Sequence, residues 1–225
     1  MSGERIELQA IDGGRIGAWL ARPTATPRGA LVIAQEIFGV NAHIRSVCED
    51  FAARGYLALA PAFFDRLESG LELDYDEAGT TRGRACVAEL GMDRPLRDVR
   101  AAADWLSAEL GQPKVGVIGY CWGGAVAFLA ATRLGLPAAS YYGRLIVDYL
   151  HERPQAPLLC HFGERDPLIP AEWVTRIEAA LPQVPVHRYP AGHGFNRLGH
   201  PDGDPACAEL ARRRSLDGLE QAWSA

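Results

Sequence analysis

Three residues of this 225-residue sequence are of the types that carry out nucleophilic catalysis together: Cys121, Asp166 and His193. Each lies in a glycine-containing loop that follows an apolar run. In such a set the thiol attacks an electrophilic carbon, the imidazole carries its proton, and the carboxylate orients the imidazole. The sequence therefore indicates a Cys-His-Asp catalytic triad, provided that the fold brings the three loops together.

The strongest local signal surrounds Cys121. An apolar run at 114–118 leads into Gly119-Tyr120-Cys121-Trp122-Gly123-Gly124, and an alanine-rich run follows at 125–131. This pattern predicts a buried strand, a tight turn and a helix whose N-terminus favours a thiolate at the apex of the turn. A nucleotide-binding turn or a packing cysteine is the structural alternative. The pattern G-x-G-x-x-G is absent, and the bulk of Tyr120 and Trp122 disfavours a pyrophosphate.

Strands and helices are expected to alternate along the rest of the chain. A hairpin is predicted at 6–10 and 15–21, and a polar, partly helical excursion at 65–91. Further strands are predicted at 30–34, 56–60, 137–142, 157–162 and 184–189, and helices at 43–54, 95–110, 171–181 and 205–223. This alternation predicts one domain over residues 1–225, with a mostly parallel sheet and helices on both faces.

The order of the candidate residues is informative as well. The nucleophile comes first, then the acid, then the histidine, and each follows a predicted strand. Because parallel strands end at one edge of a sheet, their loops can meet there. The sequence therefore predicts the α/β-hydrolase fold, in which this order of triad residues is typical.

Composition excludes several classes of function. A net charge of −5 argues against a nucleic-acid surface, and 48% hydrophobic residues predict a globular core. We expect no signal peptide, no membrane partner and a cytoplasmic location, since neither an apolar leader nor a membrane-spanning run occurs. The five cysteines form no C-x-x-C pair, so we expect neither a disulfide framework nor a metal site. We also expect the protein to be a monomer.

An acyl-transfer site also needs two N–H donors for the oxyanion of its tetrahedral intermediate. The backbone N–H of Trp122, which follows the nucleophile, is one candidate, and that of Ile37, in the loop after the 30–34 strand, is the other. Glu36 is a thiol partner, a supporting carboxylate or an exposed charge, and composition does not separate these roles. Phe38, Trp122 and Tyr142 line the pocket or belong to the core.

Several segments together resemble the dienelactone hydrolases, or carboxymethylenebutenolidases. Residues 35–41 (QEIFGVN) and 119–125 (GYCWGGA) are similar to two motifs of that family. Tyr141-Tyr142-Gly143, Asp166 with its flanking residues, and Ala191-Gly192-His193-Gly194-Phe195 match too. The resemblance covers most of the chain and implies the triad Cys121, His193 and Asp166. It also implies that Glu36 holds the resting thiol and helps to remove its proton, and it implies no cofactor.

The resemblance further implies two arginines that bind the substrate carboxylate. Arg197 matches one of them, whereas Thr80 stands at the position of the other, so Arg82 or Arg84 would have to replace it. The expected function is the opening of a small lactone or ester, such as dienelactone to maleylacetate in chloroaromatic degradation, through a thioester at Cys121. The alternatives are a thiol esterase for a different ester, and a non-catalytic binding or redox-sensing protein of the same fold.

Overall fold

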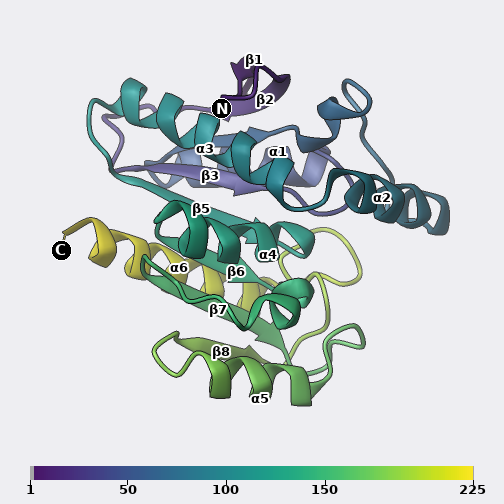
Figure 1. The fold of residues 1–225 in the computed structure, drawn as a ribbon. Coiled ribbons are helices and arrows are strands. Elements are labelled where there is room, and N and C mark those ends of the chain that lie inside the picture. Colours follow the sequence, from purple (N-terminus) through teal and green to yellow (C-terminus); the bar gives the residue numbers. More distant parts are fainter. Residues whose placement is uncertain (1–2, 225) are drawn as a thin grey trace. The chain divides into compact units, whose positions relative to one another are not determined.

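The computed structural model describes residues 3–224 (Figure 1). The chain divides into two units at the Gly116–Val117 bond. The first unit holds the predicted Glu36 loop and the excursion, and the second unit holds all three predicted triad residues. Among the described residues, no helix is long and apolar enough to cross a membrane.

Four strands pair in the first unit in the order β1-β2-β4-β3. They are β1 (Glu4–Gln9), β2 (Arg15–Ala21), β3 (Ala30–Ala34) and β4 (Leu57–Pro61). The predicted hairpin is confirmed as the antiparallel pair β1 and β2, with Gly13 at φ 81° in its turn. Strands β3 and β4 run parallel and are buried along their whole length, as expected from their continuous apolar sequences. Pro61, expected to follow its strand, is instead the last residue of β4, where it pairs with Ala18 of β2.

The helices of the first unit begin and end at residues suited to those places. They are α1 (Ala42–Ala53), the 3₁₀ helix η1 (Phe63–Arg66), α2 (Glu77–Leu90) and α3 (Asp93–Leu110). The side chain of Asn41 accepts a hydrogen bond from the Ile44 N–H at 3.2 Å, and Asp76 caps α2 through the Gly79 N–H at 2.6 Å. Helix α3 ends at Gly111, whose φ of 68° suits glycine. Helix α1 packs on β2 and β4, and α3 packs on β3 and β4.

The strands of the second unit are parallel throughout. Strand β5 (Val115–Tyr120) continues from the first unit into the second, and β6 (Ala138–Tyr141), β7 (Leu158–Gly163) and β8 (Val186–Tyr189) follow it in that order across the sheet. Their carboxyl ends therefore lie at one edge. The loops that begin there carry Cys121, Asp166 and His193.

Helices cover both faces of these strands. They are α4 (Trp122–Leu129), the π-helical turn η2 (Ala130–Leu134), the 3₁₀ helix η3 (Arg144–Tyr149), α5 (Ala171–Ala180) and α6 (Pro205–Ser224). Neighbouring side chains of β6 point to opposite faces: Ser140 lies against Gly124 of α4, and the Tyr141 hydroxyl is 2.8 Å from Ser215 of α6. Figure 1 shows α4 in front of these strands and α6 behind them. The two-faced arrangement expected from the sequence is therefore present in this unit.

Candidate active site

Cys121 stands between the last residue of β5 and the first residue of α4. Its backbone has φ 55° and ψ −116°, a conformation that is unfavourable for a residue with a Cβ. The predicted elbow is present, but α4 begins at Trp122 rather than near Ala125, so Gly123 and Gly124 belong to the helix. Cys121 therefore lies at the N-terminus of α4, as the sequence predicts.

Glycines are required around this turn because backbone atoms approach closely. A Cβ on Gly119 would lie 1.8 Å from the carbonyl oxygen of Gly123. A Cβ on Gly124 would lie 2.7 Å from the carbonyl oxygen of Tyr141. The turn can therefore bring β5, α4 and β6 together only without side chains at these positions.

The three predicted triad side chains meet within the second unit. His193 Nε2 lies 3.2 Å from Cys121 Sγ, and His193 Nδ1 lies 2.7 Å from Asp166 Oδ2. The other carboxylate oxygen of Asp166 accepts a hydrogen bond from the Leu168 N–H at 2.8 Å. The Asp166 side chain is fully buried and that of His193 is 10% exposed. A carboxylate on Nδ1 selects the tautomer that leaves Nε2 able to accept the thiol proton.

The electrostatics at His193 favour its protonated form. Burial alone would lower the pKa of His193, but the Cys121 sulfur, when ionised, and the Asp166 carboxylate raise this pKa to about 10. An imidazole with two anionic neighbours is able to take a proton from the thiol and keep it until a leaving group needs it. This is the property that a cysteine-based acyl transfer requires.

Tyr142 follows β6 and contacts His193. Its ring centroid lies 4.9 Å from that of His193 and 5.3 Å from that of Phe195, and its side chain is fully buried. Its φ of 40° is unusual for a residue other than glycine. Its N–H donates to the His161 carbonyl oxygen at 2.8 Å. Tyr142 therefore restrains His193, and its contact with a substrate stays a prediction.

In the first unit, the predicted residues Glu36, Ile37 and Phe38 follow β3. Glu36 is fully buried, and its Oε2 accepts a hydrogen bond from the Tyr75 hydroxyl at 3.0 Å. The Tyr75 ring packs at 4.5 Å on that of Phe38. These contacts exclude the exposed-charge interpretation of Glu36. Tyr75 itself was not predicted, because nothing in the polar excursion distinguishes it before the fold brings the excursion back to β3.

The arginines predicted to bind substrate occupy different environments. On α2, Arg82 donates to Glu68 at 3.1 Å and is half exposed, and Arg84 is exposed. Arg197, in contrast, is buried in the second unit and pairs with Asp202 at 3.0 Å. Only Arg197 has the burial expected of a guanidinium that selects a ligand.

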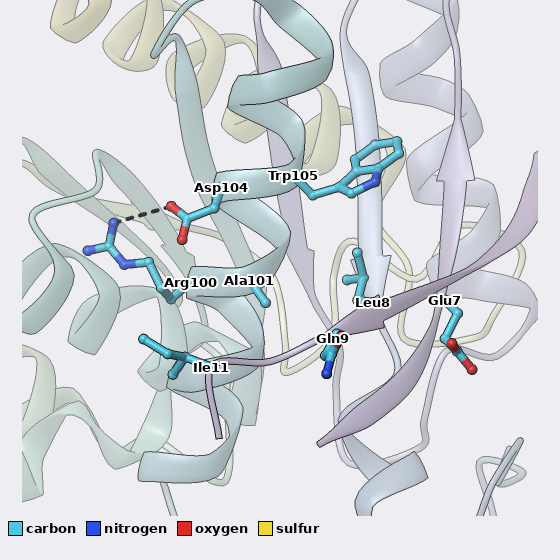
Figure 2. A pocket seen from close by; sticks show the side chains of 8 residues that line it. All are labelled: Glu7, Leu8, Gln9, Ile11, Arg100, Ala101, Asp104 and Trp105. Atoms are coloured by element: carbon cyan, nitrogen blue, oxygen red, sulfur yellow. Dashed lines mark ion pairs between the residues drawn. The ribbon is translucent and has the colours of Figure 1, made fainter. Parts of the chain in front are cut away.

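Figure 2 shows a pocket of about 460 Å³ on the first unit, between β1 and α3. Leu8, Ile11 and Trp105 supply apolar side chains, and Arg100 lies 3.7 Å from Asp104 in an ion pair. No cysteine, serine or histidine lines this pocket. This pocket therefore holds none of the predicted catalytic residues.

Comparison with known proteins identifies the family of the chain. The model of the dienelactone hydrolase family matches residues 16–223. The chain is 35% identical to a carboxymethylenebutenolidase of Pseudomonas putida, and the alignment covers 96% of this chain and 95% of that protein. The chain belongs to the dienelactone hydrolase family. The resemblance that the sequence motifs indicated is thereby confirmed.

Solved structures agree on the fold. A crystal structure described as a "putative dienelactone hydrolase" from Klebsiella pneumoniae is 27% identical and superposes with a TM-score of 0.85 over 98% of this chain and all of that one. An alpha-beta serine hydrolase homologue from Coxiella burnetii, at 15% identity, gives a TM-score of 0.69 over 96% of this chain and 98% of its own. The predicted α/β-hydrolase fold is confirmed. As a member of this family, the chain is a carboxylic ester hydrolase.

Proposed function

We propose that this enzyme opens a small lactone, such as dienelactone to maleylacetate, through a thioester on Cys121. The observation that carries the proposal is the chain of hydrogen bonds from Cys121 Sγ to His193 at 3.2 Å and from His193 to Asp166 at 2.7 Å. The Pseudomonas putida relative named carboxymethylenebutenolidase supports the choice of a lactone. Breakdown of chloroaromatic compounds is the metabolic setting that this substrate suggests.

The reaction begins when the Cys121 thiol loses its proton to His193 or Glu36. The sulfur then attacks the lactone carbonyl carbon, and negative charge moves to the carbonyl oxygen. The N–H of Trp122, the first amide of α4, and the N–H of Ile37 are the proposed donors to this oxyanion. Collapse of the intermediate breaks the bond to the ring oxygen, and this oxygen leaves with the proton that the thiol released, which His193 delivers.

Hydrolysis of the thioester completes the reaction. His193 takes a proton from water, the resulting hydroxide attacks the thioester carbonyl, and the Cys121 sulfur leaves as a thiolate that regains the proton. The Asp166 carboxylate stabilises the imidazolium of His193. The sum is one lactone and one water giving one ring-opened acid, with no change of oxidation state.

Glu36 and Tyr75 complete the proposed thiol environment. We assign to Glu36 the task of holding the resting thiol and helping to remove its proton when substrate binds. Its full burial and its hydrogen bond from Tyr75 support a fixed carboxylate in place of a solvated one. A thiol held in this way reacts little with oxidants between turnovers.

Arg197, with Arg82 or Arg84 replacing the second arginine, is the proposed site for the substrate carboxylate. Phe38 and Tyr142 are the proposed apolar contacts. The burial of Arg197 supports its role, and the ion pair of Arg82 with Glu68 weakens that residue's case. A thiol esterase for a different small ester is the second candidate, because Thr80 stands where the family's other arginine is expected.

We further propose that the chain acts as one domain and one polypeptide in the cytoplasm. A single family model that spans both units supports the one-domain assignment. The five free cysteines support a reducing compartment. Gel filtration with light scattering would give the mass in solution, to be compared with 24.4 kDa for one chain.

The deciding experiment follows the ultraviolet loss of cis- and trans-dienelactone with the wild type and the Cys121→Ala variant, with a simple aryl ester as control substrate. We expect lactone loss with the wild type only. Turnover of the aryl ester alone would keep the triad and assign a different substrate. Absence of Cys121-dependent turnover of either compound, together with rapid sulfenate formation at Cys121, would favour the redox-sensing alternative.

A further inference from the structure

The guanidinium of Arg197 lies against Gly194, the residue that follows His193. The Arg197 side chain is only 9% exposed. Its Cζ, Nε and Nη1 atoms lie 2.8 to 2.9 Å from the place where a Cβ on Gly194 would stand, and the Arg197 N–H donates to the Gly194 carbonyl oxygen at 2.8 Å. Gly194 directly follows His193, whose Nε2 contacts the Cys121 sulfur. A buried positive charge therefore packs on the backbone next to the reacting groups.

The loop after Arg197 brings a carboxylate to this charge. Asp202 Oδ2 lies 3.0 Å from Arg197 Nη1. The loop is closed by the Asp204 N–H, which donates to the Phe195 carbonyl oxygen at 2.8 Å, and by the Gly203 N–H, which donates to the His200 carbonyl oxygen at 2.9 Å. A Cβ on Gly203 would lie 2.2 Å from the Arg197 carbonyl oxygen. The fold of this loop, and not a chance side-chain rotamer, places Asp202 on Arg197.

The two partners differ in their exposure. The Asp202 side chain is 46% exposed, so its carboxylate keeps much of its hydration and can leave the guanidinium at little cost. His200 Nδ1 lies 3.4 Å from the same carboxylate oxygen, and it accepts a hydrogen bond from the Asp202 N–H at 3.3 Å. Because Arg197 is buried, breaking this ion pair costs its guanidinium more free energy than it costs the Asp202 carboxylate. An exchangeable carboxylate on a fixed guanidinium is suited to competition with a second carboxylate.

We propose that Asp202 neutralises Arg197 in the resting enzyme, competes with the carboxylate of an anionic substrate for the same guanidinium, and thereby lets the enzyme accept uncharged small esters about as well as anionic ones. Asp202 acts through Arg197 and does not touch the reacting atoms. This inference rests on the proposed hydrolysis at Cys121 and extends it to the choice of substrate. It applies to lactones and open esters alike, since the competing group is the carboxylate.

A matched pair of thiol reagents tests the inference without any ester. Iodoacetate and iodoacetamide differ in charge and hardly in size, and both alkylate a thiolate. Cys121 is the target, because the other four cysteines are buried. We expect Asp202→Asn to raise the ratio of the iodoacetate rate to the iodoacetamide rate at Cys121 by about fivefold, as removal of one nearby charge would. Asp202→Glu should restore the wild-type ratio.

Two controls separate charge from loop structure. Glu178→Gln removes the carboxylate of another arginine pair of the second unit, with Arg188 at 2.8 Å, and should leave the ratio unchanged. Arg197→Gln combined with Asp202→Asn should cancel the rise, because the guanidinium that Asp202 neutralises is then absent as well. Asp202→Ser provides a second neutral variant should the asparagine variant not fold. An unchanged ratio in a folded neutral variant would overturn the inference.

Ester kinetics then give the consequence for catalysis. Asp202→Asn should lower KM for dienelactone about fivefold, because the charge that competes with the substrate carboxylate is removed. It should leave kcat and the turnover of a neutral aryl ester nearly unchanged. If neither ester is hydrolysed while the alkylation ratio still rises, the proposed function fails and the role of Asp202 stands. If both esters are hydrolysed with no change in KM or in the alkylation ratio, the role of Asp202 fails and the proposed function stands.

Discussion

The two ring nitrogens of His193 contact different groups, and these contacts determine which nitrogen can exchange a proton with the thiol. The Asp166 carboxylate holds Nδ1, so in the mechanism that we propose the proton travels through Nε2, the nitrogen beside Cys121. Tyr142 packs on the ring and limits its rotation. The raised pKa of His193 follows from the same two neighbours, since each of them favours the imidazolium. Geometry and charge thus support the same proposed role for His193.

At the same scale, Tyr75 and Glu36 form a pair whose coupling can be measured. The Tyr75 hydroxyl donates to a buried carboxylate, and hydrogen bonds to charged groups stabilise more than neutral ones. We expect Tyr75→Phe to lower the free energy of unfolding by about 1 to 3 kcal/mol. We also expect it to lower kcat/KM for the lactone by about tenfold, because Glu36 would lose its fixed position. Urea unfolding and initial rates measure the two effects.

The control for this prediction is a double-mutant cycle with Glu36→Gln. If the two residues act together, the effects of the single variants will not add in the double variant, and the coupling should be about 0.5 to 3 kcal/mol. Additive losses of stability and activity would show that Tyr75 acts independently of Glu36.

The sequence was sufficient to predict that Cys121, Asp166 and His193 would meet, because each follows an apolar strand in an order typical of one fold. It was not sufficient to predict Tyr75 or Asp202. Both lie in polar segments whose partners, Glu36 and Arg197, are identified only when the chain is folded. Residues that act through contacts between loops leave no periodic pattern, so local sequence cannot distinguish them from solvated side chains.

At the scale of elements, the turn at Cys121 depends on close backbone contact. Gly119→Ala would place a Cβ 1.8 Å from the carbonyl oxygen of Gly123. This contact can be relieved only by moving the backbone of β5, which carries the new Cβ, or that of α4, which carries the oxygen. We expect this variant to lose more than about 4 kcal/mol of stability, or not to fold at all. Urea unfolding and soluble yield are the measurements.

Gly135→Ala is the matched control in the same unit. Gly135 has φ 66°, but a Cβ there meets nothing within 4 Å. Its substitution should therefore cost only about 1 to 2 kcal/mol, the penalty of a left-handed backbone for alanine. Equal losses for the two variants would contradict the steric explanation of Gly119.

Elements were predicted best where burial is complete. The apolar run at 30–34 is β3 to the residue, because a strand buried on both faces has a continuous apolar sequence. The start of α4 was missed because Gly123 and Gly124 are typical of turns, and their place inside a helix follows from contact with β5 and β6. The π-helical turn η2 was also missed, since the alanine-rich run predicts an ordinary helix there. Tertiary contact decided each of these differences.

For the molecule as a whole, His161 links stability to pH. It is fully buried on β7, with Nδ1 2.8 Å from the Tyr189 hydroxyl and Nε2 2.9 Å from Ser215 Oγ. Burial lowers the pKa of His161 well below its usual value, and the neighbouring His187 and Arg214 lower it further. The folded chain therefore keeps this imidazole neutral, whereas the unfolded chain protonates it below about pH 6.5.

The sign of the effect follows from proton counts. Below about pH 6.5 the unfolded state binds one more proton than the folded state at His161, so the free energy of unfolding falls by up to about 1.4 kcal/mol for each pH unit of acidification. We expect His161→Gln to be less stable than the wild type at pH 8, because the substitution removes the hydrogen bonds of the imidazole. Between pH 7 and pH 5, however, the variant should lose less stability than the wild type. His151→Gln, an exposed control, should keep the wild-type slope. Urea unfolding at each pH measures the three slopes. Parallel slopes for all three proteins would mean that His161 takes up its proton without unfolding, which its burial and its two hydrogen-bond partners argue against.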